Sequence, residues 1–104
     1  MYFLMRCHHH PQQDAARDKF RPEHREWVRT GGNGKAIVLI GSAMVDDQGI
    51  SLGNFGILEA QSLADAEAFA HGDPFYAAGI VAKVEIERLA DTFQAHRIPE
   101  PMTQ

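Results

Sequence analysis

Four segments of the chain carry the hydrophobic pattern of β-strands. In IVAKVEIERL at 80–89, apolar and charged side chains alternate, which is typical of a strand with one face in the core and one in solvent. YFLMRC at 2–7, KAIVLIGSAM at 35–44 and FGILEA at 55–60 are more continuously apolar and also predict strands. The polar segment VDDQGISLGN at 45–54 is then the connection between the second and third strands.

A proline interrupts the helical pattern between the first two predicted strands. Residues 12–20 predict a polar helix. Pro22 predicts a break near Arg21, because proline lacks the N–H that a helix interior needs but fits the first turn of a new helix. A second helix is therefore expected over 22–30, and GGNG at 31–34 ends it.

One stripe of this helix is apolar except for a histidine. The stripe has the spacing i, i+4, i+7 and i+8 and contains Phe20, His24, Trp27 and Val28. His24 is therefore expected to face inward, where an unsatisfied polar group costs about 1 to 3 kcal/mol. A carboxylate is its natural partner, because it accepts from one ring nitrogen and leaves the other free to act as a base near neutral pH.

A second helix pattern follows the third strand. Ser62 and Asp65 resemble a capping box at the start of a helix over 63–70, which HGDP at 71–74 ends, and 75–78 could form one more turn. The order of elements is βαββαβ. This order predicts an α+β, ferredoxin-like fold, with an antiparallel sheet and its helices on one face.

Two of the predicted strands indicate an assembly. YFLM and AIVLI are continuously apolar, whereas a sheet with one covered face should alternate apolar and polar side chains. The helices cover only one face. We therefore expect a homodimer in which the open sheet faces of two copies cover each other.

Composition narrows the classes of function. The 104 residues are 44% hydrophobic and 23% charged, as in one soluble domain, and carry a formal charge of −4. Nucleic acid is therefore not expected as a partner. No stretch of about 20 apolar residues suggests a membrane span, and Cys7 is the one cysteine, so we expect a cytoplasmic protein without an intramolecular disulfide.

Several segments together resemble the YciI-like, or YCII-related, family. They are RPEH at 21–24, Gly41 after the second strand, EAQSLADAEAFAHGDPF at 59–75 and AGIVAKVEI at 78–86. The resemblance covers roughly residues 1–89 as one domain and leaves 90–104 as a C-terminal tail. It implies a ferredoxin-like fold that pairs as a dimeric α/β barrel. One branch of this family looks like dehydrochlorinases of chlorinated hydroxyhydroquinones, and related barrels include muconolactone isomerases.

The resemblance also implies an active site built on His24 and Asp73. From the residues alone, His24 could simply pack, and Asp73 could simply begin a turn before Pro74. Arg21 is a candidate contact for an anionic or phenolate substrate, because a guanidinium offers a planar fork of donors, although it could equally be a solvated charge. Further candidates for the pocket lining, each also explained by packing or a turn, are Ser42, Phe75 and Tyr76.

His8, His9 and His10 raise the question of a metal site. Two alternate imidazoles with a carboxylate would suit a transition metal, but no further motif completes a ligand set, so we expect a solvated loop and no metal. The sequence thus predicts a small cofactor-independent enzyme, of the dehydrochlorinase or isomerase kind, with a small-molecule substrate and proton transfer by His24. The alternative is a non-catalytic dimeric module that binds a small ligand or a protein.

Overall fold

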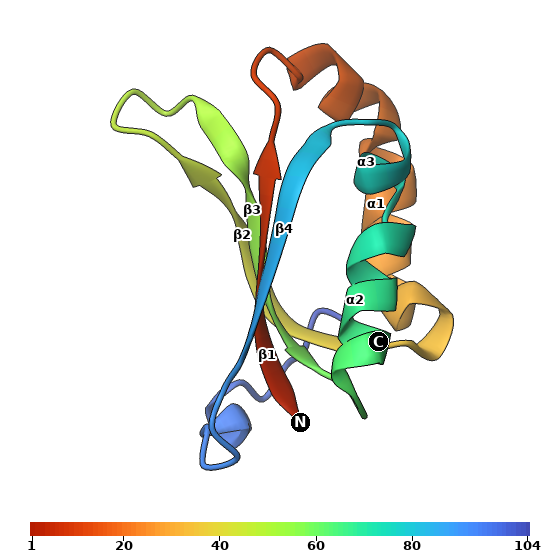
Figure 1. Cartoon of the computed structure of the whole chain (residues 1–104), viewed down its shortest axis with the longest axis vertical. Coiled ribbons are helices and arrows are strands. Elements are labelled where there is room, and N and C mark those ends of the chain that lie inside the picture. Colours follow the sequence, from red (N-terminus) through yellow and green to blue (C-terminus); the bar gives the residue numbers. More distant parts are fainter.

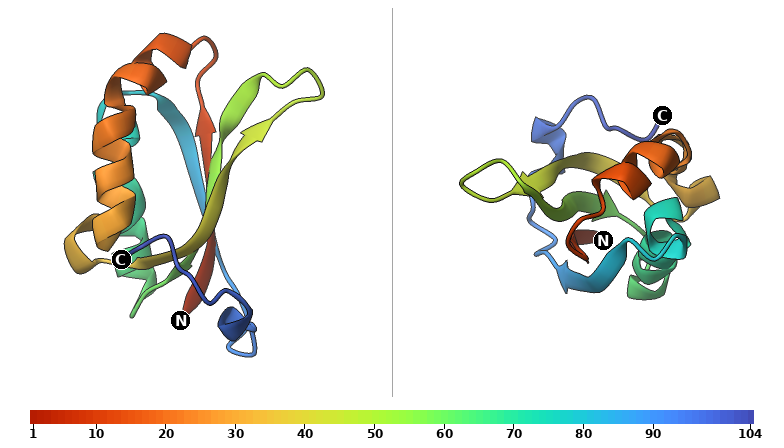
Figure 2. Two further views of the ribbon diagram at one scale, coloured as in Figure 1. Left: turned by 180° about the vertical axis from the view of Figure 1, so that it is seen from behind. Right: turned by 90° about the horizontal axis from the view of Figure 1, so that it is seen from above.

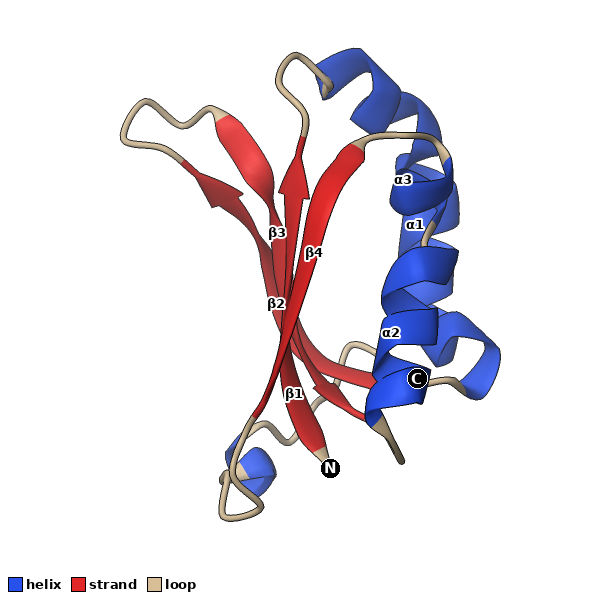
Figure 3. Cartoon of the chain, in the orientation of Figure 1, coloured by secondary structure: helices blue, strands red, loops and turns tan.

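The computed structural model describes all residues, 1–104, as one sheet with helices on one face (Figures 1 and 3). The elements in chain order are β1 (Tyr2–His9), α1 (Asp14–Gly34), β2 (Ile37–Val45), β3 (Ser51–Glu59), α2 (Leu63–Gly72), the short α3 (Pro74–Ala77), β4 (Val81–Arg88) and the 3₁₀ turn η1 (Ala95–Arg97). The strands pair antiparallel in the order β2-β3-β1-β4. The predicted ferredoxin-like βαββαβ topology is confirmed.

The alternation of β1 explains which face of the sheet is the core. Phe3, Met5 and Cys7 point toward the helices and are buried. Leu58 of β3 and Phe69 of α2 complete this core between the sheet and the helices. A strand that places every second side chain in the core leaves the residues between them on the open face of the sheet.

The predicted break near Arg21 is wrong, because α1 continues through Pro22. Proline removes one backbone donor from the ladder, and the remaining turns hold the helix together through the side chains that it packs on the core. Figure 2 shows the first turns of α1 inclined to the rest. The helix ends at Gly31, Gly32 and Asn33, whose φ angles of 62°, 63° and 58° lie in the left-handed region.

Trp27 joins α1 to α2. Its indole Nε1 donates a hydrogen bond of 3.0 Å to the carbonyl of Phe69, and the two rings stack with centroids 5.9 Å apart. The indole lies so close to Gly72 that a Cβ there would be 2.5 Å from the ring. Glycine is therefore required at the end of α2, and α1 and α2 form one layer over the sheet.

The hairpin between β2 and β3 is shorter than predicted. The Asp46 carboxylate accepts hydrogen bonds from the backbone N–H groups of Gln48 and Ile50, which closes the turn within 46–50. Strand β3 therefore begins at Ser51 and not at residue 55. Gly53 is part of this extension, and a Cβ there would lie 2.0 Å from the carbonyl oxygen of Cys7, so only glycine permits the close approach to β1.

The residues after β4 pack back along the domain. The ring of Phe93 contacts Tyr2, with centroids 5.3 Å apart, on the sheet face opposite the helices. The chain then passes around the edge strand β2 to α1, where it ends (Figure 2). There the backbone N–H of Met102 donates to the carbonyl of Val38, and the hydroxyl of Thr103 donates to the carbonyl of Val28.

Candidate active site

His24 and Asp73 form the centre of the candidate site. The Nδ1 atom of His24, on α1, lies 2.9 and 2.8 Å from the two carboxylate oxygens of Asp73. An ionised carboxylate only accepts hydrogen bonds, so Nδ1 carries the hydrogen and the lone pair of a neutral ring is on Nε2. The structure thus brings together two residues that are 49 positions apart in the sequence.

Asp73 is held at the junction of α2 and α3. It caps α3, since its Oδ1 accepts a hydrogen bond of 2.8 Å from the backbone N–H of Phe75, while Pro74 occupies the first turn. The carboxylate is only 10% exposed. A buried charge needs several partners, and the imidazole of His24 and this N–H supply them.

Phe75 fixes the plane of the His24 ring. The two rings are parallel within 3°, with centroids 4.1 Å apart. The imidazole is therefore positioned by its hydrogen bonds to Asp73 at one edge and by an aromatic ring against one face. A base that is held in one orientation loses little entropy when it engages a substrate.

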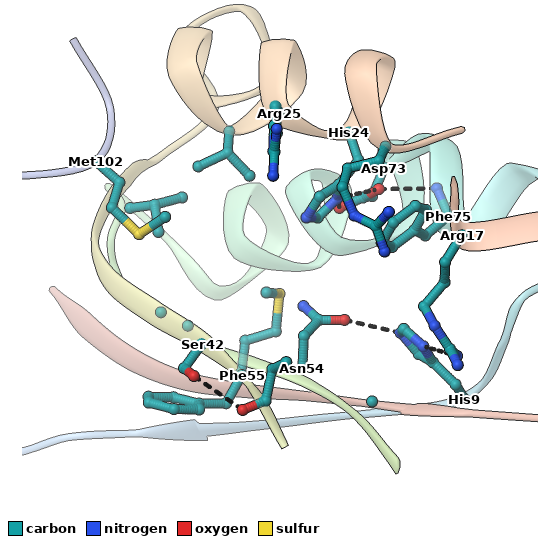
Figure 4. Close-up of a pocket in the computed structure, with 18 of the residues that line it drawn as sticks. His9, Arg17, His24, Arg25, Ser42, Asn54, Phe55, Asp73, Phe75 and Met102 are labelled. Carbon is teal, nitrogen blue, oxygen red and sulfur yellow. Dashed lines mark hydrogen bonds and ion pairs between the residues drawn. The ribbon is translucent and has the colours of Figure 1, made fainter. Parts of the chain in front are cut away.

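A cavity of about 570 Å³ lies between α1 and the β2–β3 end of the sheet and includes this pair. Its apolar lining includes Met5, Val28, Val38 and Phe69. Its polar lining includes His9, Arg17, Arg21, Arg25, Asn54 and Asp73 (Figure 4). No hydrogen bond within the chain involves Nε2 of His24. This nitrogen is therefore available to a ligand in the cavity, whose lining beside His24 is partly apolar.

The other predicted site residues are placed differently from one another. Arg21 and Phe75 line the cavity, and the guanidinium of Arg21 contacts Asp18 one turn earlier. Ser42 borders the cavity but is exposed, and its hydroxyl donates to the carbonyl of Ala43. Tyr76 is 41% exposed, packs on His71 and does not line the cavity.

Four polar residues form a hydrogen-bonded chain, of which the sequence analysis had singled out only His9. Asp14 contacts Nη2 of Arg17, whose Nη1 lies 3.1 Å from Nδ1 of His9. The Nε2 atom of the same imidazole lies 2.8 Å from Oδ1 of Asn54. This chain runs from the start of α1 across β1 to β3, along one wall of the cavity (Figure 4).

His9 was expected in a solvated loop, and this expectation is wrong. Strand β1 extends to His9, whose ring lies at 87° to the ring of Phe75 with centroids 5.8 Å apart. Burial, and secondarily the charge of Arg17, lower the pKa of His9 below its ordinary value, although the hydrogen bond with Asn54 acts in the opposite direction. The alternation of Met5 and Cys7, continued for one more step, would have found this residue.

Cys7 and His8 do not line the cavity. Cys7 is buried, and burial together with the charge of Asp73 raises its pKa to about 12, so the thiol is not activated as a nucleophile. His8 lies on the opposite sheet face from His9, where Nε2 contacts Glu85 at 2.6 Å.

No group of three or more His, Cys, Asp or Glu side chains is arranged to hold a metal ion. None of the helices has both the length and the apolar character to cross a membrane.

The comparison with known families agrees with the fold. The YCII-related domain matches residues 1–90, so the chain belongs to this family, as its motifs predicted. The structure of 5-chloro-2-hydroxyhydroquinone dehydrochlorinase (TftG) from Burkholderia phenoliruptrix, in complex with 2,5-dihydroxybenzoquinone, is similar with a TM-score of 0.73. The two sequences are 24% identical, and the match covers 86% of this chain and 94% of that one.

Two other solved structures match with lower scores. Rv0793 from Mycobacterium tuberculosis has a TM-score of 0.46 at 13% identity and covers 89% of this chain and 97% of that one. An antibiotic biosynthesis monooxygenase has a TM-score of 0.46 at 18% identity, with coverages of 86% and 97%. A search of curated proteins finds no match to the chain. At 24% identity, the likeness to the TftG structure establishes the fold alone.

Proposed function

We propose that this chain is a small enzyme that moves protons on a small, oxygen-bearing ring substrate, with His24 as general base and Asp73 as its positioning partner. The observation that carries the proposal is the unbonded Nε2 of His24 at a cavity, while Nδ1 is tied to a buried carboxylate. Such an arrangement leaves one nitrogen free to accept a proton and stabilises the imidazolium that forms. No bound cofactor is needed for this chemistry.

The cavity lining favours an aromatic-derived ring as the substrate. Met5, Val28 and Phe69 supply apolar surface, and the guanidinium groups of Arg21 and Arg25 supply charge at the α1 side. Arginine at the margin of an apolar pocket suits a phenolate or enolate oxygen. A flat ring that carries hydroxyl groups meets both requirements.

Dehydrochlorination of a chlorinated hydroxyhydroquinone is the reaction that we propose. After His24 removes one hydroxyl proton, its imidazolium can return that proton to the ring at the carbon that carries chlorine. Transfer of a second hydroxyl proton to the neutral His24 then expels chloride with its bonding electron pair. The sum is loss of HCl and formation of a quinone, so the step balances without an oxidant. The fold shared with 5-chloro-2-hydroxyhydroquinone dehydrochlorinase supports this choice of substrate class.

The test is chloride release from 5-chloro-2-hydroxyhydroquinone by the purified chain. We expect turnover by the wild type, and a loss of at least about a hundredfold in His24→Gln, the low end of what general base catalysis contributes. His96→Gln is the matched control, since His96 is exposed on η1 and does not line the cavity. No chloride from the wild type would overturn the reaction, and full activity in His24→Gln would overturn the role of His24. The related proton transfer, isomerisation, is assayed in parallel on a muconolactone.

A non-catalytic binding module is the alternative expected from the sequence. In such a module the His24 and Asp73 pair would be sealed and purely structural. The exposed fraction of 19% for the His24 side chain, at a cavity, favours the enzyme. A thermal melt of His24→Ala separates the two: a large loss of stability with unchanged ligand binding would favour the module.

We also propose that two copies of the chain pair through the open sheet face. Ile40, Ile57 and Leu4 are cross-strand neighbours in one row on this face, and Ile40 is 45% exposed. The residues after β4 cover the end of the face near Tyr2 and form a pocket with Ile57, so the row of three side chains begins at the border of the part left for a second copy. A mass of one chain by light scattering at micromolar concentration would overturn the dimer. The substitution Ile40→Lys is expected to dissociate it, because a charge would be buried at the interface.

A further inference from the structure

Asn54 lies on the wall of the cavity, on the sheet side, across from His24 on the helix side (Figure 4). Its Oδ1 is hydrogen-bonded to His9, and its Nδ2 makes no hydrogen bond within the chain. We infer that the Asn54 amide is a fixed hydrogen-bond donor that binds a substrate oxygen, and that Asp14, Arg17 and His9 hold it in that orientation. This inference deepens the proposed function and rests on it for the identity of the substrate.

The direction of every hydrogen bond in this chain follows from one fact. A guanidinium has donors and no acceptor, so Arg17 donates to Nδ1 of His9, at 3.1 Å. A neutral imidazole that accepts at Nδ1 carries its hydrogen on Nε2. That N–H must donate, and its partner at 2.8 Å is therefore the carbonyl oxygen of Asn54, not the NH₂ group. The two N–H donors of Asn54 are left for the cavity.

The hydrogen-bonded residues are packed tightly enough to hold the Asn54 amide in this orientation. Arg17 is only 7% exposed, although arginine is rarely buried, and its second nitrogen contacts Asp14. The His9 ring lies nearly perpendicular to Phe75, which also stacks on His24. His9, which orients the donor on β3, and the base on α1 are therefore both packed against one aromatic ring before a ligand enters.

The arrangement defines what each side of the cavity accepts. Nε2 of His24 takes a proton, so a hydroxyl group belongs there, whereas the NH₂ group of Asn54 takes an acceptor oxygen. In the proposed reaction, an oxygen of the ring gains negative charge when a hydroxyl proton leaves and becomes a quinone carbonyl when chloride leaves. Preorganised donors at such an oxygen stabilise the transition state more than the substrate. The ligand class is therefore a ring with a hydroxyl group and an acceptor oxygen on opposite edges.

Binding of 2,5-dihydroxybenzoquinone tests the donor without any turnover. The substitution Asn54→Asp keeps an oxygen for His9 and replaces the two donors by an acceptor. We expect its Kd for the quinone to rise at least tenfold, while the amide-to-carboxylate control Gln48→Glu, at the exposed hairpin turn, leaves Kd unchanged. An Asn54→Asp variant that binds as tightly as the wild type would overturn the inference, and so would a wild type that does not bind the quinone. A wild type that binds the quinone through Asn54 but releases no chloride would leave the inference standing and overturn only the proposed reaction.

Nitrogen NMR of the His9 ring tests the positioning role. In the wild type we expect the hydrogen on Nε2 and the lone pair on Nδ1. The substitution His9→Leu should release the amide and weaken quinone binding, and His9→Gln, which keeps a donor to Asn54, should restore most of it. A hydrogen on Nδ1, or unchanged binding in a folded His9→Leu variant, would show that His9 does not hold the Asn54 amide in place and would overturn the positioning role.

Discussion

The ring of Phe75 lies parallel to the imidazole of His24, 4.1 Å away, while the backbone N–H of Phe75 donates to Asp73. One residue thus positions both the base and its carboxylate. Asp73 caps the short helix that begins at Pro74, and this helix turns Phe75 under His24. The geometry of the pair therefore depends on a packing residue that takes no part in proton transfer.

The substitution Phe75→Leu should lower turnover about tenfold and the free energy of unfolding by about 1 to 3 kcal/mol, because a leucine leaves a void under His24. Tyr76→Leu is the matched control on the same helix, since Tyr76 is exposed and outside the cavity. Turnover of chlorinated hydroxyhydroquinone and urea unfolding measure the two effects. Wild-type turnover in Phe75→Leu would show that the stacking does not position the base. A loss of turnover in Tyr76→Leu would show that Tyr76 belongs to the site after all.

The pH dependence of stability should report on His9. Burial lowers its pKa below the ordinary value of 6.5, so below that pH the unfolded chain takes up a proton that the folded chain resists. Stability from this residue is therefore complete above pH 6.5 and declines as the pH falls toward the folded value. The groups that face the ring and set this balance are Arg17, Asn54, His24 and Asp73.

Melting temperatures between pH 7.5 and 5.5 check this dependence. The decline should be shallower in His9→Gln than in the wild type, since the variant has no group to titrate. His10→Gln is the control, because His10 is exposed beside His9. Equal slopes in wild type and His9→Gln would contradict the burial that lowers the pKa of His9.

Cys7 should resist thiol reagents in the native state. Its thiol is buried in the core cluster that also contains Phe69 and Leu58, and burial raises its pKa to about 12, so almost no thiolate exists near neutral pH. We expect labelling by a disulfide reagent only at the rate of global unfolding, and full labelling in denaturant. Fast labelling of the folded chain at pH 8 would show that the core opens locally.

Periodicity predicted the fold and the inward position of His24, the resemblance to the YCII-related family added Asp73, and the reasons for the omissions are local. The helical stripe that contains His24 could be read from spacing, because every turn of α1 faces the same core. Pro22 predicted a break that α1 does not make, since proline interrupts the hydrogen bonding of a helix without forcing the chain to leave it. Spacing alone did not distinguish a helix that tolerates Pro22 from two helices.

Two of the missed residues lie where the predicted strands were too short. Strand β1 was ended at residue 7 and β3 begun at residue 55, whereas the structure extends them to His9 and Ser51. Both His9 and Asn54 fall in the added residues and face the cavity. Polar residues at the ends of strands resemble loops in composition, whereas the pairing of Asn54 with Cys7 and of His9 with Val81 identifies both as part of the sheet.

Thr103 should contribute to stability although it lies beyond the matched family domain. Its hydroxyl donates to the carbonyl of Val28 and accepts from the backbone N–H of Val38, each at 2.8 Å, and thereby joins α1 to the edge strand β2. The substitution Thr103→Val removes both hydrogen bonds and keeps the shape of the side chain. Leaving these backbone groups without partners should lower the free energy of unfolding by about 1 to 3 kcal/mol.

The matched control for this effect is Thr92→Val, on the exposed turn after β4, where the hydroxyl makes no hydrogen bond within the chain. Urea unfolding of both variants measures the difference. Because Met102, next to Thr103, lines the cavity, Thr103→Val should also weaken quinone binding several-fold. A variant as stable as Thr92→Val would mean that the last residues lie on the domain without holding it, and unchanged binding would remove Met102 from the wall of the site.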